Sequence, residues 1–229
     1  MIDLIKNDDI SCLVLFGSHA TNDADEDSDI DLLGINKSTL RTVRENGKVN
    51  LSLYSLDELI RMAESGNIFI LHIILEGICI FNPTIFNELK DKFKYKDNYN
   101  IDIATAFYLA TVILREKDNI SNWVIANKRI SWCVRTILIS ISVQNRKPLF
   151  SKSKLASSCI ESGLDFEESF SLIDAKSNKE RNDKILDYLA CFLDNYKDYN
   201  EEIVRSNFSS GIVVATLDSI FTTPPLYDE

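Results

Sequence analysis

Two aspartates separated by one residue, at the start of an apolar run, are the residues best suited to chemistry. Asp29 and Asp31 flank Ile30 in the sequence SDIDLL. Because successive side chains of a strand point to opposite faces, the two carboxylates would share one face. Such a pair repels itself unless a cation lies between its members. Oxygen ligands of this kind suit Mg²⁺ or Mn²⁺, and such an ion would also bridge the phosphates of a nucleotide.

A glycine and a serine follow the preceding apolar run, in the sequence LVLFGS. Gly17 allows the backbone to approach a phosphate closely, and Ser18 offers a hydroxyl and an amide to it. A helix beginning just after Ser18 would add its N-terminus to this anion site. His19 would then lie either near the phosphates or in solvent at the start of that helix. The pattern therefore predicts a phosphate-binding turn.

The acidic stretch between these two patterns has a simpler interpretation, which is a solvated turn. Four of its acids fit that description: Asp23, Asp25, Glu26 and Asp27. A solvated turn does not explain why Asp29 and Asp31 enter an apolar strand, where an unpaired carboxylate is costly. These last two acids therefore stay the candidate metal ligands.

The elements that would position these residues alternate strand and helix patterns over the first 97 residues. The sequence SLDE, at Ser55–Glu58, has the form of a capping box and predicts the start of a helix there. The expected strands cover residues 11–16, 30–35, 49–54 and 78–81, and the expected helices begin at Leu56 and cover 68–75. This order predicts a small α/β unit over residues 1–97.

Helical spacing of apolar residues dominates from about Asn98 onward. The expected helices cover residues 101–117, 121–144, 154–162, 166–174 and 184–199. We therefore expect a helical domain over residues 98–222, followed by an extended tail over 223–229. Pro224 and Pro225 lie side by side in that tail, and prolines favour a polyproline-like conformation.

The segments Phe16-Gly17-Ser18 and Ser28-Asp29-Ile30-Asp31-Leu32 together resemble the signature of the DNA polymerase β-like nucleotidyltransferase superfamily. The resemblance covers roughly the first 97 residues. It implies an α+β or α/β mixed-sheet domain, here followed by an all-helical bundle. It also implies metal-dependent transfer of a nucleoside monophosphate from a nucleoside triphosphate, with Mg²⁺ or Mn²⁺ as cofactor. Asp29 and Asp31 would be catalytic and would ligate the metal, while Gly17 and Ser18 would hold the triphosphate.

The sequence departs from the superfamily at the third carboxylate, which usually lies on the strand after Asp-x-Asp. The strand reads VNLSLY here, with Asn50 and Ser52 where an acid is expected. Three explanations stay open. Glu76 could supply a substitute carboxylate, the enzyme could work without a general base because bound metal lowers the pKa of a hydroxyl, or the domain could bind nucleotide without catalysis.

The helical domain and the tail carry two further candidates. In related two-domain nucleotidyltransferases the second domain often supplies a basic residue to the triphosphate, and Lys128 or Arg129 could serve here. The alternative is a surface cation paired with the abundant acids.

Tyr227, near the chain end, could accept nucleotides itself. This plan resembles the nucleotidyltransferases of Hailong-type anti-phage systems, which make deoxyadenosine oligomers from such a tyrosine and restrain a membrane effector. The resemblance favours (d)ATP as donor and an effector bound through the product.

Two rival functions are also compatible with these residues. The first is a minimal-nucleotidyltransferase antitoxin, or a related transferase that adenylylates a protein, a tRNA end or a small molecule. The second is a nucleotide- or partner-binding module that kept the fold and lost the reaction.

Composition restricts the functional class further. The chain has 35 Asp and Glu against 25 Lys and Arg, a formal net charge of −10, which excludes a protein that coats duplex nucleic acid by charge. We therefore expect nucleotidyl transfer that does not use a template.

No apolar run reaches the roughly 18 residues of a membrane helix, and the N-terminus lacks the pattern of a secretory signal. The five cysteines form no CxxC pair, which favours reduced thiols and a cytoplasmic protein.

Overall fold

The computed structural model describes residues 10–24, 26, 28–37, 42–159, 163–197 and 211–221. Contacts divide the chain into two compact units, Met1–Asp97 and Asn98–Glu229. The expected tail over 223–229, with Tyr227, lies outside the described residues. Asp25 and Asp27 of the acidic stretch also lie outside them.

The first unit is built on a five-stranded mixed sheet with the strand order β3-β4-β2-β1-β5. Strand β1 runs antiparallel to β2 and β5, whereas β4 runs parallel to β2 and antiparallel to β3. The strands are β1 (Ile10–Phe16), β2 (Ile30–Asn36), β3 (Thr42–Asn46), β4 (Val49–Ser55) and β5 (Ile78–Phe81). The expected runs at 11–16, 30–35 and 49–54 form the three central strands, which confirms the mixed-sheet fold.

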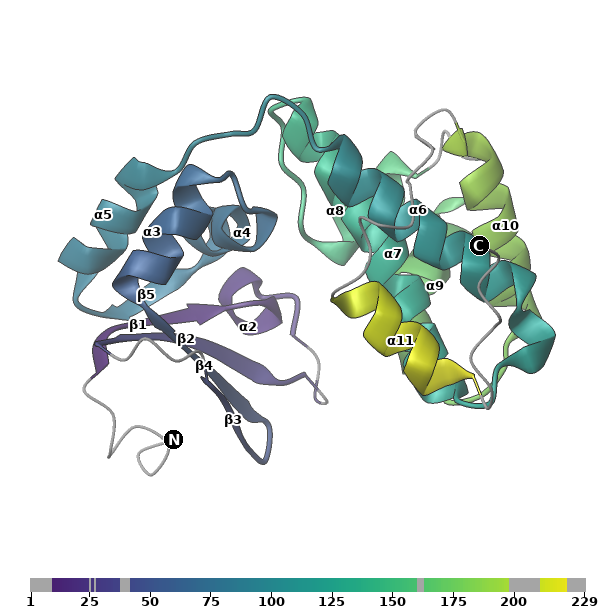
Figure 1. Ribbon diagram of the computed structural model, residues 1–229, viewed down its shortest axis with the longest axis horizontal. Coiled ribbons are helices and arrows are strands. Elements are labelled where there is room, and N and C mark those ends of the chain that lie inside the picture. Colours follow the sequence, from purple (N-terminus) through teal and green to yellow (C-terminus); the bar gives the residue numbers. More distant parts are fainter. Residues whose placement is uncertain are drawn as a thin grey trace. The chain divides into compact units, whose positions relative to one another are not determined.

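Three helices cover one face of this sheet (Figure 1): α3 (Leu56–Glu64), α4 (Ile68–Glu76) and α5 (Pro83–Lys92). Val14, Leu33 and Ile35 point into the core beneath them, where Leu59 and Ile70 are fully buried. Residues two apart on a strand share a face. Asp31 therefore lies on the helix-covered face, at the end of the row that continues through Leu33 and Ile35.

The N-terminus of α4 is capped by Asn67. Its side-chain oxygen accepts hydrogen bonds from the backbone N–H groups of Phe69 at 2.9 Å and Ile70 at 3.4 Å. Asn67→Ala removes this acceptor, and we expect it to lower the free energy of unfolding by about 1 kcal/mol in urea titrations. Asn87, exposed on α5, provides the control. A loss in Asn67→Ala no larger than that in Asn87→Ala would show that the cap contributes nothing.

The second unit is a helical bundle, as expected. Its central helices are α6 and α7, which contribute the buried side chains of Ile103, Phe107, Ile130 and Val134 to one core with Phe192. The helices are α6 (Asn100–Arg115), α7 (Trp123–Gln144), α8 (Lys152–Ser158), α9 (Phe166–Ile173), α10 (Asp183–Asn195) and α11 (Ile212–Ile220). Within the described ranges, no helix combines the length and the apolar character that crossing a membrane requires.

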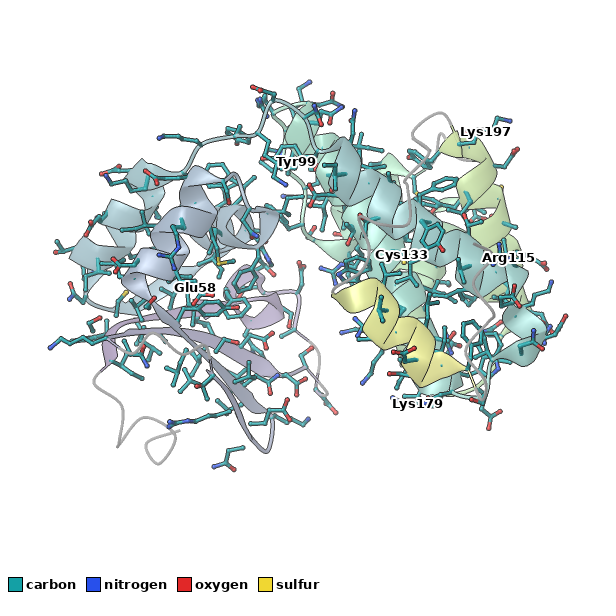
Figure 2. All side chains as sticks on the ribbon, viewed as in Figure 1. Glu58, Tyr99, Arg115, Cys133, Lys179 and Lys197 are labelled. Carbon is teal, nitrogen blue, oxygen red and sulfur yellow. The ribbon has the colours of Figure 1, made fainter. Side chains whose placement is uncertain are left out.

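The cysteines are free thiols, and three of them are buried. Cys133 lies inside the helical bundle (Figure 2), and burial raises the pKa of its thiol. Burial, with a smaller contribution from neighbouring Cys79, raises the pKa of Cys12 to about 12. Both buried thiols therefore stay protonated at neutral pH and act as small apolar core residues.

Candidate active site

The carboxylate of Asp31 lies directly against the glycine that follows β1. Asp31 pairs with Phe16 in the antiparallel register of β1 and β2, so Gly17 comes next to it. Gly17 has φ 74° and ψ −157°, a backbone conformation that favours glycine. A Cβ at this position would lie only 2.8 Å from the Oδ2 atom of Asp31. Glycine is therefore needed here for its conformation and for the space it leaves beside the carboxylate.

A single helical turn, α2 (Ser18–Thr21), begins directly after this glycine. The backbone N–H of Ala20 donates to the carbonyl of Gly17, and that of Asp23 to the carbonyl of Ser18, both at 3.0 Å. The helix start expected after Ser18 is thus present, but one turn sums few peptide dipoles. Phosphate binding here would depend on local N–H groups and on the Ser18 hydroxyl.

Asp29 is exposed and precedes β2 rather than lying within it. The turn between β3 and β4 supports the chain on both sides of Asp29. The backbone N–H of Ile30 donates to the Lys48 carbonyl at 2.6 Å, and the Lys48 ammonium donates to the carbonyl of Glu26. The two aspartates therefore differ, because Asp31 is half-buried on a strand and Asp29 is accessible at its entrance.

His19 links the Gly-Ser turn to the same entrance. Its Nε2 atom lies 3.2 Å from the carbonyl oxygen of Ser28, the residue before Asp29. The side chain is half-buried, so the solvated alternative does not describe it. Sequence patterns gave no signal for this contact, because it joins α2 to the segment before β2, nine residues further along the chain.

Asn50 is the second contact that the sequence did not predict. It lies opposite Asp31 in the parallel register of β2 and β4, and its Nδ2 atom donates to Asp31 Oδ1 at 3.2 Å. Ser52 lies opposite Leu33, one step further from the site. Of the two β4 positions where an acid was expected, Asn50 is thus the one that contacts the aspartate.

Glu76 ends α4, where its Oε2 atom lies 3.1 Å from Nε2 of His72. Strand β5 begins at Ile78, opposite Leu15 of β1, so Glu76 lies towards the same end of the sheet as Gly17. Strand β1 separates β5 from β2 and its Asp31. The structure thus gives Glu76 a partner on its own helix, and its role as a substitute carboxylate stays a prediction.

Lys128 and Arg129 both lie on α7, in the second unit. Lys128 is exposed, whereas Arg129 is half-buried. Within the described part of the chain, the buried Nε atom of Arg129 has no hydrogen-bond partner. Since an unsatisfied buried donor is costly, Arg129 is the better candidate of the two for binding an anion.

The donor set fits a divalent cation that also uses substrate oxygens. Mg²⁺ is usually bound by one or two carboxylates together with phosphates and water. Asp31 offers an oxygen beside the space that Gly17 leaves open, and Asp29 is accessible at the strand entrance. Across the described ranges, no group of three or more His, Cys, Asp or Glu side chains is arranged to hold a metal. A metal at this site would take its other ligands from nucleotide phosphates and water.

Comparison with protein families supports a nucleotidyltransferase domain in the first unit. Residues 2–84 match the family described as polymerase beta, nucleotidyltransferase. Among solved structures, a nucleotidyltransferase-like protein from Exiguobacterium sibiricum 255-15 matches with 14% identity and a TM-score of 0.33, over 87% of this chain and 73% of that one. No curated protein matches the chain. The matched segment contains the Gly-Ser turn, both aspartates and Asn50, and it belongs to the polymerase β-like nucleotidyltransferase superfamily.

Proposed function

We propose that the protein transfers a nucleoside monophosphate from a (d)NTP, with (d)ATP favoured, to a hydroxyl acceptor without a template. The observation that carries the proposal is the position of the Asp31 carboxylate beside Gly17, where a Cβ would lie 2.8 Å from Oδ2. A metal-binding carboxylate and a phosphate-binding turn act together only when one bound molecule contacts both of them. A metal-bound triphosphate meets that condition.

In the proposed reaction, the acceptor oxygen forms a bond to the α-phosphorus, and the bond from that phosphorus to the bridging oxygen breaks. Pyrophosphate leaves, and the hydroxyl proton passes to solvent. Asp29 and Asp31 would hold an Mg²⁺ or Mn²⁺ ion, which would supply neutralisation of phosphate charge and a lower pKa for the attacking hydroxyl. Gly17 and Ser18 orient the triphosphate, and Arg129 or Lys128 stays our candidate for binding an anionic group of the nucleotide.

Intact-mass measurement tests this function. The purified chain is incubated with Mg²⁺ and each NTP or dNTP in turn, with Asp31→Asn as the inactive control. A ladder of nucleotide-sized increments that disappears in Tyr227→Phe would support self-priming and the anti-phage context. A single increment on an added protein, tRNA or small molecule would support the antitoxin-like alternative. Absence of any product with every donor and acceptor would contradict transfer.

The binding-module alternative has one observation in its favour, which is the amide of Asn50 beside Asp31 where the superfamily usually has an acid. Tight nucleotide binding without any product would support it. If the protein catalyses transfer, we propose that the reaction takes place in the cytoplasm and that a membrane effector or a toxin binds the product.

Ser18 provides a test of triphosphate binding that is separate from metal binding. Ser18→Ala removes one hydroxyl donor from the turn, and we expect KM for the nucleotide to rise about tenfold, because a hydrogen bond to a charged group contributes about 1.5 kcal/mol. The change in kcat should be smaller. Steady-state kinetics of pyrophosphate release measure both, and an unchanged KM would contradict the role of Ser18.

Glu76 is tested by Glu76→Gln, which keeps the shape of the side chain and removes its charge. A residue that supplies the missing carboxylate should lose about 100-fold or more in kcat on this change, as general bases do. We expect a loss below about threefold, since Glu76 already contacts His72 and its helix leads into β5, which β1 separates from β2 in the sheet. Pyrophosphate release again measures the rate.

A further inference from the structure

The two oxygens of the Asp31 carboxylate have different surroundings. Oδ1 accepts the amide hydrogen of Asn50 at 3.2 Å, from the neighbouring parallel strand. Oδ2 faces the space beside Gly17 that a Cβ would fill. One oxygen is thus held by a donor, while the other is directed towards the Gly-Ser turn. The hydrogen bond from Asn50 therefore restrains the orientation of the carboxylate and keeps Oδ2 on the side of the turn.

The type of side chain at position 50 matters because the Asn50 amide lies only 3.2 Å from the Asp31 carboxylate. A carboxylate in place of the Asn50 amide would face Asp31 at about 3 Å, and two such groups repel each other strongly unless a cation separates them. The amide instead donates a hydrogen bond to Asp31. It therefore keeps the site ordered before metal binds, at the cost of one negative charge that would have attracted the metal.

We infer that Asn50 is the positioning residue of Asp31, holding its carboxylate ready for a divalent cation and replacing the charge of a third acid by a hydrogen bond. This inference rests on the proposed function, because it concerns the same metal site. It follows that the protein binds the metal more weakly than a three-carboxylate site would, and that it relies more on the phosphates of the nucleotide. The residue at position 50 thus determines how well the site is ordered without metal and how tightly the site binds metal.

The test measures Mn²⁺ binding by electron paramagnetic resonance, in the presence of a non-hydrolysable nucleoside triphosphate analogue. Asn50→Leu removes the donor and keeps the branched shape of the side chain, and Asn50→Asp adds the charge. Ser52→Ala, on the same strand and face, is the matched control, and Asp31→Asn removes the metal ligand. Thermal unfolding with and without Mn²⁺ is recorded for each variant, so that loss of fold is distinguished from loss of binding.

We expect the Kd for Mn²⁺ to rise about tenfold in Asn50→Leu, the usual size of effect for a residue that orients a metal ligand. Asn50→Asp should unfold at a lower temperature than wild type without metal, and should gain more stability from Mn²⁺ because metal relieves the repulsion. A residue with a purely structural role would not change the response to metal. Ser52→Ala should match wild type.

Two outcomes separate this inference from the proposed function. If Asp31→Asn loses Mn²⁺ while both Asn50 variants bind it as wild type does, the positioning role is wrong and the metal site stands. If Asp31→Asn binds Mn²⁺ as tightly as wild type, the metal assignment is wrong, and both the inference and the proposed function are contradicted.

Discussion

Asp31→Ala is expected to abolish nucleotidyl transfer while the protein stays folded. Asp31 is half-buried near the start of β2 and is not one of the buried apolar residues that form the core under the helices, so its removal should cost little stability. We expect the rate to fall at least about 1,000-fold, which corresponds to about 4 kcal/mol of lost transition-state stabilisation, because the variant lacks a metal ligand. Pyrophosphate release measures the rate, and circular dichroism checks the fold.

Asp91→Ala provides the control for removal of an acid from the first unit, because Asp91 is exposed near the end of α5. This control should keep the wild-type rate. Asp29→Ala should resemble Asp31→Ala, although Asp29 is the more exposed of the two. Wild-type turnover in either aspartate variant would show that the chemistry takes place elsewhere.

The central strands were predictable because their sequences are unambiguous. Residues 11–16 and 30–35 are almost entirely apolar, as strands covered on both faces are, and residues 49–54 alternate. Phe16 of β1 pairs with Asp31 of β2, and this pairing brings the Gly-Ser turn next to Asp31. The proximity of the two motifs was expected from the superfamily resemblance, whereas the contact with Asn50 requires the register of β2 and β4, which no local pattern contains.

Three described elements were missed, for different reasons. Strand β3 has the sequence TVREN, too polar to be identified as a strand, and its stability comes from pairing with β4. The turn between them begins at Gly47, with φ 60°, and a glycine there is a hairpin signal that could have revealed the strand. Helix α5 begins at Pro83, and proline is common at the first position of a helix as well as at the end of a strand.

The third missed element, α11, is a short apolar helix whose identity depends on its packing. Its residues Val213, Leu217 and Ile220 are buried in the core of the helical unit. Phe221 forms an isolated bridge with Ile120, which fixes the end of the helix. A short apolar segment can be strand or helix by periodicity alone, so tertiary contacts decide its conformation.

Gly17→Ala should also lower transfer strongly, by a different route from the removal of an aspartate. Alanine is strained at φ 74°, and its Cβ would lie 2.8 Å from Asp31 Oδ2. The strain alone costs about 1–3 kcal/mol of stability. In addition, the carboxylate must move away from the turn, so we expect transfer to fall at least about 100-fold in pyrophosphate-release assays, since misplacement by about 1 Å has that effect.

Gly163→Ala separates the two causes. Gly163 also has a positive φ, of 80°, but its nearest contact for an added Cβ is the Cys191 sulfur at an ordinary 3.7 Å. Both variants should therefore lose stability from backbone strain, measured in urea, whereas only Gly17→Ala should lose transfer. If the two variants lose transfer equally, the loss follows from general destabilisation. If Gly17→Ala keeps the wild-type rate, the carboxylate is not needed where it lies, because alanine at position 17 cannot leave it there.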